Sequence, residues 1–318
     1  MICAVRSWRL LILATVVTLS ALSLRIDRVR SAELAIPEAS SRNPPDETRS
    51  TTDSVIIHGR REREVKEQIS KYVSGAVFSY LNDSLERWNR PICPLVAGLP
   101  QERGEFILAR ISQIAKDSHA PLGPEQCEPN LFIVVTDNPD VLLEKWTKRD
   151  RHMLNTCNGM GYVKEFLHSR QPVRVYYNAR FSTGGADRGL SALELPGVQL
   201  NLPFPECLGP GTHSRLTFGA VQEMTSVIIV VDSRQTTHLN MGQLADYLGM
   251  VGLAQIHVNA NTGTAPTILH LFQRIEPRVQ GLTLWDRAFL QSLYTTDQAS
   301  VLEVITIKRR MFEQIIGR

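Results

Sequence analysis

The sequence predicts an α+β, or mixed α/β, protein in which a single mixed β-sheet is packed with helices. Two apolar, β-branched runs, NLFIVVTD at 130–137 and EMTSVIIVVDS at 223–233, are typical of buried strands. Segments with apolar residues at a helical period separate and follow these runs. The predicted strands first alternate with helices, and the last part of the chain is helical. This order favours one sheet covered by helices.

The first half of the chain predicts three strand–helix pairs. SVIIHG at 54–59 reads as a short strand that ends at a glycine. Prolines flank Cys93, so any strand there is short or lies at a sheet edge. The predicted helices cover 61–81, 104–118 and 139–148, and the second of them should bury Phe106, Ile107, Ile111, Ile114 and Ala115.

The second half predicts a half-exposed strand at 172–181 and a helix at 240–256. Residues 182–214, rich in Gly and Pro, form no long predicted element, and such a loop is typical of a contact surface. Two more helices are expected after residue 282. The last one should bury a stripe that comprises Val301, Val304, Ile305, Met311, Phe312 and Ile315.

The N-terminus predicts export. Arginines precede an uncharged run at 10–24, a pattern typical of a signal peptide and short for a permanent membrane span. We therefore assign 1–31 to a signal peptide or short membrane anchor and 32–53 to a flexible linker. Residues 54–318 are expected to form a single globular domain, with two sub-lobes meeting near 150–160 as the alternative.

Four cysteines remain if the signal is removed: Cys93, Cys127, Cys157 and Cys207. An even number in an exported protein indicates two disulfides, for which three connectivities exist. Chain order favours Cys93–Cys127 and Cys157–Cys207. A metal site would need closer spacing, such as C-x-x-C.

Composition and motifs exclude several functions. The net charge of +3 is spread along the chain, which argues against nucleic-acid binding. The signatures H-E-x-x-H, G-x-S-x-G and G-x-x-x-x-G-K-[ST] are absent from the sequence. No cofactor is therefore predicted. The alternative is a zinc site built from Asp246, His257 and His270.

The helix at 240–256 lies where zinc peptidases carry H-E-x-x-H. The comparable positions hold Gly242, Gln243 and Asp246, or Ala245, Asp246 and Gly249, and neither register supplies two ligands. Asn240 and Gln243 predict a capping box, and Thr283 and Asp286 predict another. The small residues Gly249 and Gly252 predict close packing against the strand at 223–233. We interpret this helix as a buried structural element.

One candidate binding surface lies on the strand at 172–181. Arg174, Tyr176 and Arg180, together with Tyr177, are of the residue types that line anion-binding grooves. The interpretation requires their side chains to share an open surface.

The chain from Cys93 onward resembles exported alphaproteobacterial proteins of unassigned function. The segments that carry this resemblance are CEPNLFIVVTD, DYLGMVGLAQI, TILHLF and LTLWDRAFLQSLY. The order of strand, helix, TIL turn and Asp-containing helix is remotely similar to zincin-like proteins. That resemblance implies a shared scaffold without the metal ligands.

The sequence thus favours an exported, non-catalytic protein of the cell envelope that binds an unknown protein or other envelope partner. It would be periplasmic or secreted, and it would contact the membrane through the N-terminal segment only if that segment is retained. The alternative function is a metal-dependent, peptidase-like hydrolase with non-standard ligands.

Overall fold

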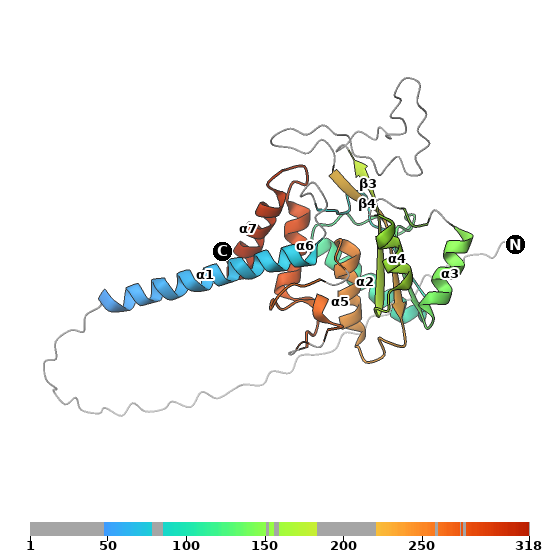
Figure 1. Cartoon of the computed structure of the whole chain (residues 1–318), viewed down its shortest axis with the longest axis horizontal. Coiled ribbons are helices and arrows are strands. Elements are labelled where there is room, and N and C mark those ends of the chain that lie inside the picture. The colour runs from blue at the N-terminus through green and yellow to red at the C-terminus, as the bar shows by residue number, and fades with distance from the viewer. Residues whose placement is uncertain are drawn as a thin grey trace, which may run out of the picture. The chain divides into compact units, whose positions relative to one another are not determined.

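The computed structural model describes residues 48–77, 85–150, 153–155, 159–182, 221–257, 260–273, 275 and 278–317. Within them lie seven α-helices and one four-stranded sheet (Figure 1). In chain order the elements are α1 (Thr48–Ala76), β1 (Pro94–Ala97), α2 (Gln101–Asp117), β2 (Leu131–Thr136), α3 (Pro139–Arg149), α4 (Met160–His168), β3 (Val173–Ser182), β4 (Val221–Asp232), α5 (Met241–Leu253), the 3₁₀ turn η2 (Ile268–His270), α6 (Leu284–Thr295) and α7 (Glu303–Ile316).

The strands form one mixed sheet in the order β1-β2-β4-β3. β1, β2 and β4 are parallel, and β3 runs antiparallel to β4 at the far edge. This confirms the predicted class, a single mixed sheet packed with helices. β1 is a short edge strand, as the flanking prolines predict.

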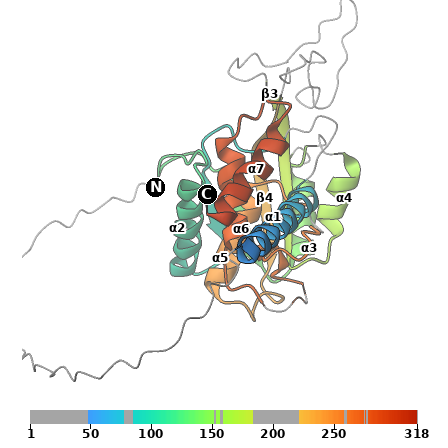
Figure 2. The ribbon, with the colours of Figure 1, turned by 90° about the vertical axis from the view of Figure 1, so that its left-hand side faces the viewer.

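Each face of the sheet is covered by helices (Figure 2). Side chains alternate between the two faces of a sheet along a strand, so adjacent residues of β3 contact the helices on opposite faces. Tyr176 stacks against Tyr162 of α4, with ring centroids 5.0 Å apart. The adjacent Tyr177 donates to the carbonyl of Val251 on α5 (2.8 Å). Both rings are fully buried. The prediction of a half-exposed β3 was therefore wrong, because α4 covers the face that was expected to meet solvent.

Both predicted capping boxes are present. The Asn240 side chain accepts from Gln243 N (2.8 Å) and the Gln243 side chain accepts from Asn240 N (3.2 Å). Thr283 and Asp286 make the same reciprocal pair at the start of α6. These pairs satisfy amides that the first helical turn leaves without partners, so local sequence fixes where both helices begin.

The N-terminal part of the domain differs from the expectation. Residues 54–59, predicted as a strand, belong to α1, which begins at Thr48 inside the predicted linker. The helix-forming segment that follows the β-branched run extends back through it as one continuous helix. Residues 1–47, which hold the expected signal or anchor, lie outside the described residues. Among the helices that are described, none is long and apolar enough to span a bilayer.

The two glycines of α5 face different neighbours. A Cβ on Gly252 would lie 3.2 Å from Leu131 of β2 and 3.7 Å from Ile229 of β4, which confirms close packing on the sheet. A Cβ on Gly249 would instead lie 2.6 Å from Ile114 of α2. Gly249 therefore allows α5 to approach α2, and the prediction that it packs on the strand was wrong.

The segment before β1 ties the C-terminal helices to the sheet. Arg87 and Glu303 form a buried ion pair, and Arg87 also donates to the carbonyl of Thr296 (2.9 Å). Glu303 accepts from Leu85 N (2.9 Å). Because each charge has several partners in the core, loss of either one would leave the other buried and uncompensated.

Two predicted core residues are exposed. Phe106 on α2 is 47 % exposed, and Ile305 on α7 is 65 % exposed. Their positions fit a helical stripe, but each stripe is wider than the surface that the neighbouring helices cover. On α7 the buried apolar residues are Ile307, Met311 and Phe312, so the buried stripe begins two positions after Ile305.

Candidate functional site

A cleft of about 380 Å³ lies between the edge strand β3 and the C-terminal half of α5. The loop after α5, the turn η2 and the residues that follow it complete its wall. The described lining residues are Gln171, Pro172, Val173, Val175, Tyr177, Tyr247, Val251, Ile256, His257, Ala260, Asn261, Leu269, Phe272 and Gln273.

β3 presents both side chains and backbone to this region. The carbonyl of Pro172 accepts from Asp232 N on β4 (2.8 Å), so even-numbered residues direct their backbone groups toward β4. The carbonyl of Val175 accepts instead from the Tyr162 hydroxyl (3.3 Å). The backbone N–H and C=O groups of Val173 and Val175 therefore point to the outer edge, while their side chains line the cleft.

Tyr177 forms the deepest polar link in the wall. Its hydroxyl donates to the Val251 carbonyl (2.8 Å) and accepts from Ile256 N (3.1 Å). Burial raises the pKa of Tyr177 far above its ordinary value, so the phenol stays neutral. The hydroxyl thus fixes the end of α5 against β3, and its single proton is donated within the protein.

Tyr247 and Val251 are the two α5 residues in the lining. They are four residues apart and so lie on one face of the helix. Tyr247 packs edge-on against Phe272, with ring centroids 4.9 Å apart, and burial raises its pKa to about 12. A zinc peptidase helix presents two histidines at this spacing. Here the cleft-facing pair is a phenol and an isopropyl group, and neither binds zinc at neutral pH.

The described lining contains no Lys, Arg, Asp, Glu or Cys side chain. His257 supplies an imidazole, and its backbone N–H donates to the Ala76 carbonyl at the end of α1 (2.7 Å). Gln171, Asn261 and Gln273 supply amides. The surface is therefore apolar with amide groups, which is chemistry suited to binding a neutral ligand.

The three residues of the alternative zinc site have separate partners. Both oxygens of Asp246 bond to Arg110, the second at 3.1 Å, and one also accepts from Leu282 N (2.7 Å). His270 is buried and lies 2.7 Å from the Thr262 hydroxyl. Of the three, only His257 lines the cleft. No group of three His, Cys, Asp or Glu side chains suited to a metal ion occurs in the described part of the chain.

Neither register proposed for the α5 motif faces the cleft. Asp246, which both registers share, points toward α2 and forms an ion pair with Arg110. The orientation of a helix around its own axis depends on the sheet beneath it. Local sequence therefore did not indicate that Tyr247 and Val251 are the cleft-facing pair.

The residues proposed for an anion-binding groove do not share an open surface. Arg174 is buried, donates to the Leu167 carbonyl (3.0 Å) and pairs with Asp140 (2.7 Å). Tyr176 is buried and donates to the Asn155 carbonyl. Arg180 pairs with Glu223. These contacts hold α3, α4 and β4 around β3, so the described contacts of all three residues are structural.

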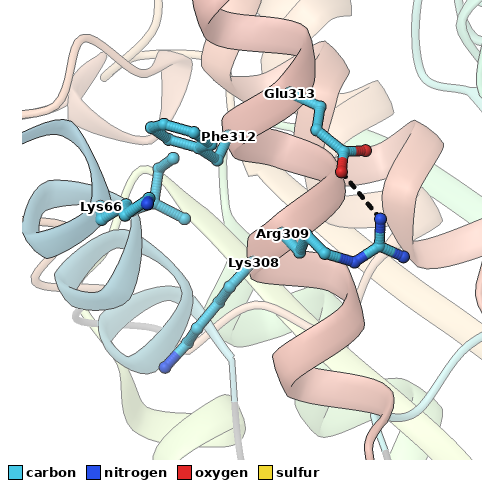
Figure 3. A pocket seen from close by; sticks show the side chains of 6 residues that line it. Lys66, Lys308, Arg309, Phe312 and Glu313 are labelled. Carbon is cyan, nitrogen blue, oxygen red and sulfur yellow. Dashed lines mark hydrogen bonds and ion pairs between the residues drawn. The ribbon is translucent and has the colours of Figure 1, made fainter. Parts of the chain in front are cut away.

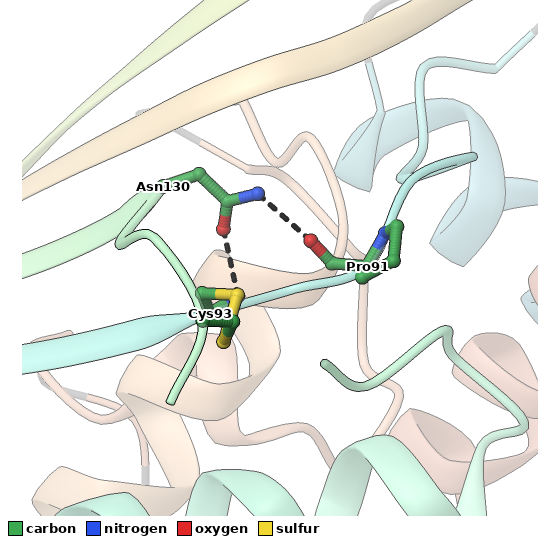
Figure 4. The surroundings of a disulfide bond; sticks show 4 residues. Pro91, Cys93 and Asn130 are labelled. Carbon is green, nitrogen blue, oxygen red and sulfur yellow. Dashed lines mark hydrogen bonds between the residues drawn. A yellow bond between two sulfur atoms is a disulfide. The ribbon is translucent and has the colours of Figure 1, made fainter. Parts of the chain in front are cut away.

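The Cys93–Cys127 disulfide is present, with Cα atoms 5.8 Å apart (Figure 4). The Asn130 side chain accepts from Cys93 N (2.8 Å) and donates to the Pro91 carbonyl (2.8 Å). The closed loop contains β1 and α2, so the disulfide secures the crossover between the first two parallel strands. Cys157 and Cys207, and most of the predicted contact loop 182–214, lie outside the described residues.

Sequence reasoning missed Glu86. It is 3 % exposed, and neither carboxylate oxygen has a hydrogen-bond partner in the described residues. Burial raises its pKa to about 8. A carboxyl group in this state retains its proton at neutral pH. Its neighbours Leu85 and Arg87 are also buried, but a Leu-Glu-Arg sequence is common on exposed helices and loops and gave no clear signal of burial.

Comparisons with known proteins give no further guide. No family model matches the chain, and no curated protein or solved structure matches it. The function must therefore be inferred from the cleft itself.

Proposed function

We propose that this protein is an exported, non-catalytic binding protein of the cell envelope. In this proposal the cleft between β3 and α5 holds an extended, uncharged segment of a partner protein. The supporting observation is that an apolar, amide-bearing lining without described charges lies beside the outer edge of β3. The Cys93–Cys127 disulfide is compatible with an oxidising, extracytoplasmic compartment.

An extended peptide fits this site because it can add a strand to a sheet edge. The backbone groups of Val173 and the N–H of Val175 would pair with the peptide, and alternate peptide side chains would enter the cleft. Amides at Gln171, Asn261 and Gln273 match the donors and acceptors of a peptide main chain. The Tyr162 hydroxyl already donates to the Val175 carbonyl at this edge. The added strand would therefore either end at Val175 or displace that hydrogen bond.

Chemistry on such a segment would need groups that the described lining lacks. Amide hydrolysis uses an activated nucleophile, a carboxylate pair or a metal-bound water. The proposed zinc-dependent alternative with Asp246, His257 and His270 has no described observation in its favour. We also retain two resemblances as proposals. The kinship with exported alphaproteobacterial proteins rests on the sequence runs quoted above, and the zincin-like scaffold rests on the order of β4, α5, η2 and α6.

The proposal is tested by photo-crosslinking in the envelope of cells that produce the protein. The benzophenone analogue of phenylalanine is placed at Phe272, which lines the cleft. The matched control places it at Phe106, an exposed phenylalanine on α2 outside the lining. A second variant, Gln273→Trp, fills the cleft from its exposed rim.

We expect one protein adduct at position 272, no such adduct at 106, and loss of the 272 adduct when Gln273→Trp is added. Identical adducts at 272 and 106, or a 272 adduct that survives Gln273→Trp, would contradict a partner bound in the cleft.

A further inference from the structure

A second surface, which shares no lining residue with the cleft, lies between α1 and α7. A groove of about 690 Å³ is lined by Lys66 and Ile69 of α1 and by Lys308, Arg309, Phe312 and Glu313 of α7 (Figure 3). The two buried side chains at its floor, Ile69 and Phe312, are apolar. The remaining lining residues carry three positive charges and one negative charge.

The two lysines of the groove are not neutralised by described carboxylates. Lys66 lies over the Phe312 ring, 4.6 Å from its centroid. Lys308 extends from α7 toward α1 and donates to the Ser70 hydroxyl (3.0 Å). The one carboxylate, Glu313, is paired with Arg309 (2.7 Å). The groove therefore presents an excess of positive charge over an apolar floor.

The same face of α7 continues with exposed apolar residues. Leu302 at the N-cap and Ile305 are 55 % and 65 % exposed. Ile305 precedes Arg309 by four positions and Phe312 by seven, so helical geometry places all three on one face. Apolar side chains that project singly from a helix have no cavity to fill. They gain from burial only if the medium beyond the surface is itself apolar.

We propose that the α1–α7 face docks onto an anionic lipid bilayer. The lysine ammonium groups would meet lipid phosphates, while Leu302 and Ile305 would enter the boundary between headgroups and acyl chains. Amphipathic surfaces with Lys and Arg beside Leu and Ile bind membranes in this way. A bilayer interface accommodates both the charges and the protruding Leu302 and Ile305 without a shaped pocket, whereas a protein partner would need a matching acidic and apolar surface.

This docking is independent of the cleft, so it can fail while the proposed peptide binding holds. It also differs from the expected N-terminal anchor, since its determinants lie in the folded domain. The test must therefore report on α7 itself rather than on overall attachment to vesicles.

Hydrogen–deuterium exchange of the full chain provides this local measurement. We expect vesicles of phosphatidylethanolamine and phosphatidylglycerol to slow exchange in α7, and phosphatidylcholine vesicles to leave it unchanged. Each lysine near an anionic surface raises partitioning about fivefold. The Lys66→Gln/Lys308→Gln variant should therefore need about 25-fold more anionic lipid for half-maximal protection.

The matched control is Lys148→Gln/Lys164→Gln, which removes the same charge from exposed positions on α3 and α4. It should behave as the wild type, whereas Ile305→Ser, a change at an exposed side chain, should weaken protection. Raising salt to about 0.5 M should abolish it. Absence of α7 protection on anionic vesicles, or equal loss in the control variant, would overturn the proposal.

Discussion

Tyr247 and Val251 lie one helical turn apart on α5 and both face the cleft beside β3. At this spacing a zinc peptidase helix presents two histidines, whereas these two side chains of α5 offer no zinc ligand at neutral pH. The described lining of the cleft is apolar with amide groups, and the proposed peptide binding rests on that surface.

Metal content is the first consequence. Purified protein should contain zinc well below one equivalent, and neither zinc nor a chelator should shift its melting temperature, because Asp246, His257 and His270 have separate partners. Elemental analysis and thermal melts check this. Stoichiometric zinc, lost together with stability on chelation, would support the hydrolase alternative instead.

Asp246 should matter for stability. It is buried, binds Arg110 and accepts from Leu282 N, so Asp246→Asn weakens a buried charge-assisted pair and should cost about 1–3 kcal/mol. The exposed Glu144→Gln, which breaks a surface pair with Lys148, should cost less than about 1 kcal/mol. Denaturant unfolding compares them, and equal costs would remove the structural role assigned to Asp246.

Gly249 tests the packing between α5 and α2. A leucine there would place its Cβ 2.6 Å from Ile114 and should destabilise the fold by about 1–3 kcal/mol or more. The paired variant Gly249→Leu/Ile114→Ala should recover part of this loss because space is returned at the contact. Thermal melts measure both. A Gly249→Leu protein that melts like wild type would show that α2 and α5 are less closely packed.

The disulfide should stabilise the domain by about 3–4 kcal/mol, since it closes a loop of moderate length between Cys93 and Cys127. The Cys93→Ser/Cys127→Ser variant measures this by denaturant unfolding.

Gly123 gives a more specific test, because a Cβ there would lie 2.8 Å from one sulfur and 2.9 Å from the other. Gly123→Ala should therefore cost more in the oxidised protein than in the cysteine-free one. Equal costs would contradict this arrangement.

Glu86 should make stability depend on pH. Its folded pKa is about 8, above the ordinary value of 4.5, so its contribution is complete below about pH 4.5 and is lost as pH rises through 8. The loss approaches about 5 kcal/mol. Unfolding free energies between about pH 5 and 9 should fall more steeply in wild type than in Glu86→Gln. The exposed Glu102→Gln serves as control. Parallel curves for wild type and Glu86→Gln would contradict the buried, unpaired state.

Local signals explain which features the sequence could predict. Asn240 with Gln243 and Thr283 with Asp286 act within one helical turn, and both capping boxes form. The apolar runs of β2 and β4 likewise carry their own burial signal. The missed features depend on distant residues. Arg87 meets Glu303 across the chain, and α4 covers Tyr176 only after the sheet has formed. The face that α5 turns to the cleft depends on the same long-range packing.

Peptide affinity tests the central claim most directly. A displayed library of random peptides is selected on the wild-type protein, and the affinity of the selected peptides is measured by calorimetry for wild type and for Gln273→Trp, which fills the cleft. We expect neutral, apolar peptides whose affinity falls at least about tenfold with Gln273→Trp, and whose backbone amides matter at every second position, as strand addition to β3 requires. Peptides that bind both proteins equally, or a library that yields no binder, would contradict a peptide-binding cleft.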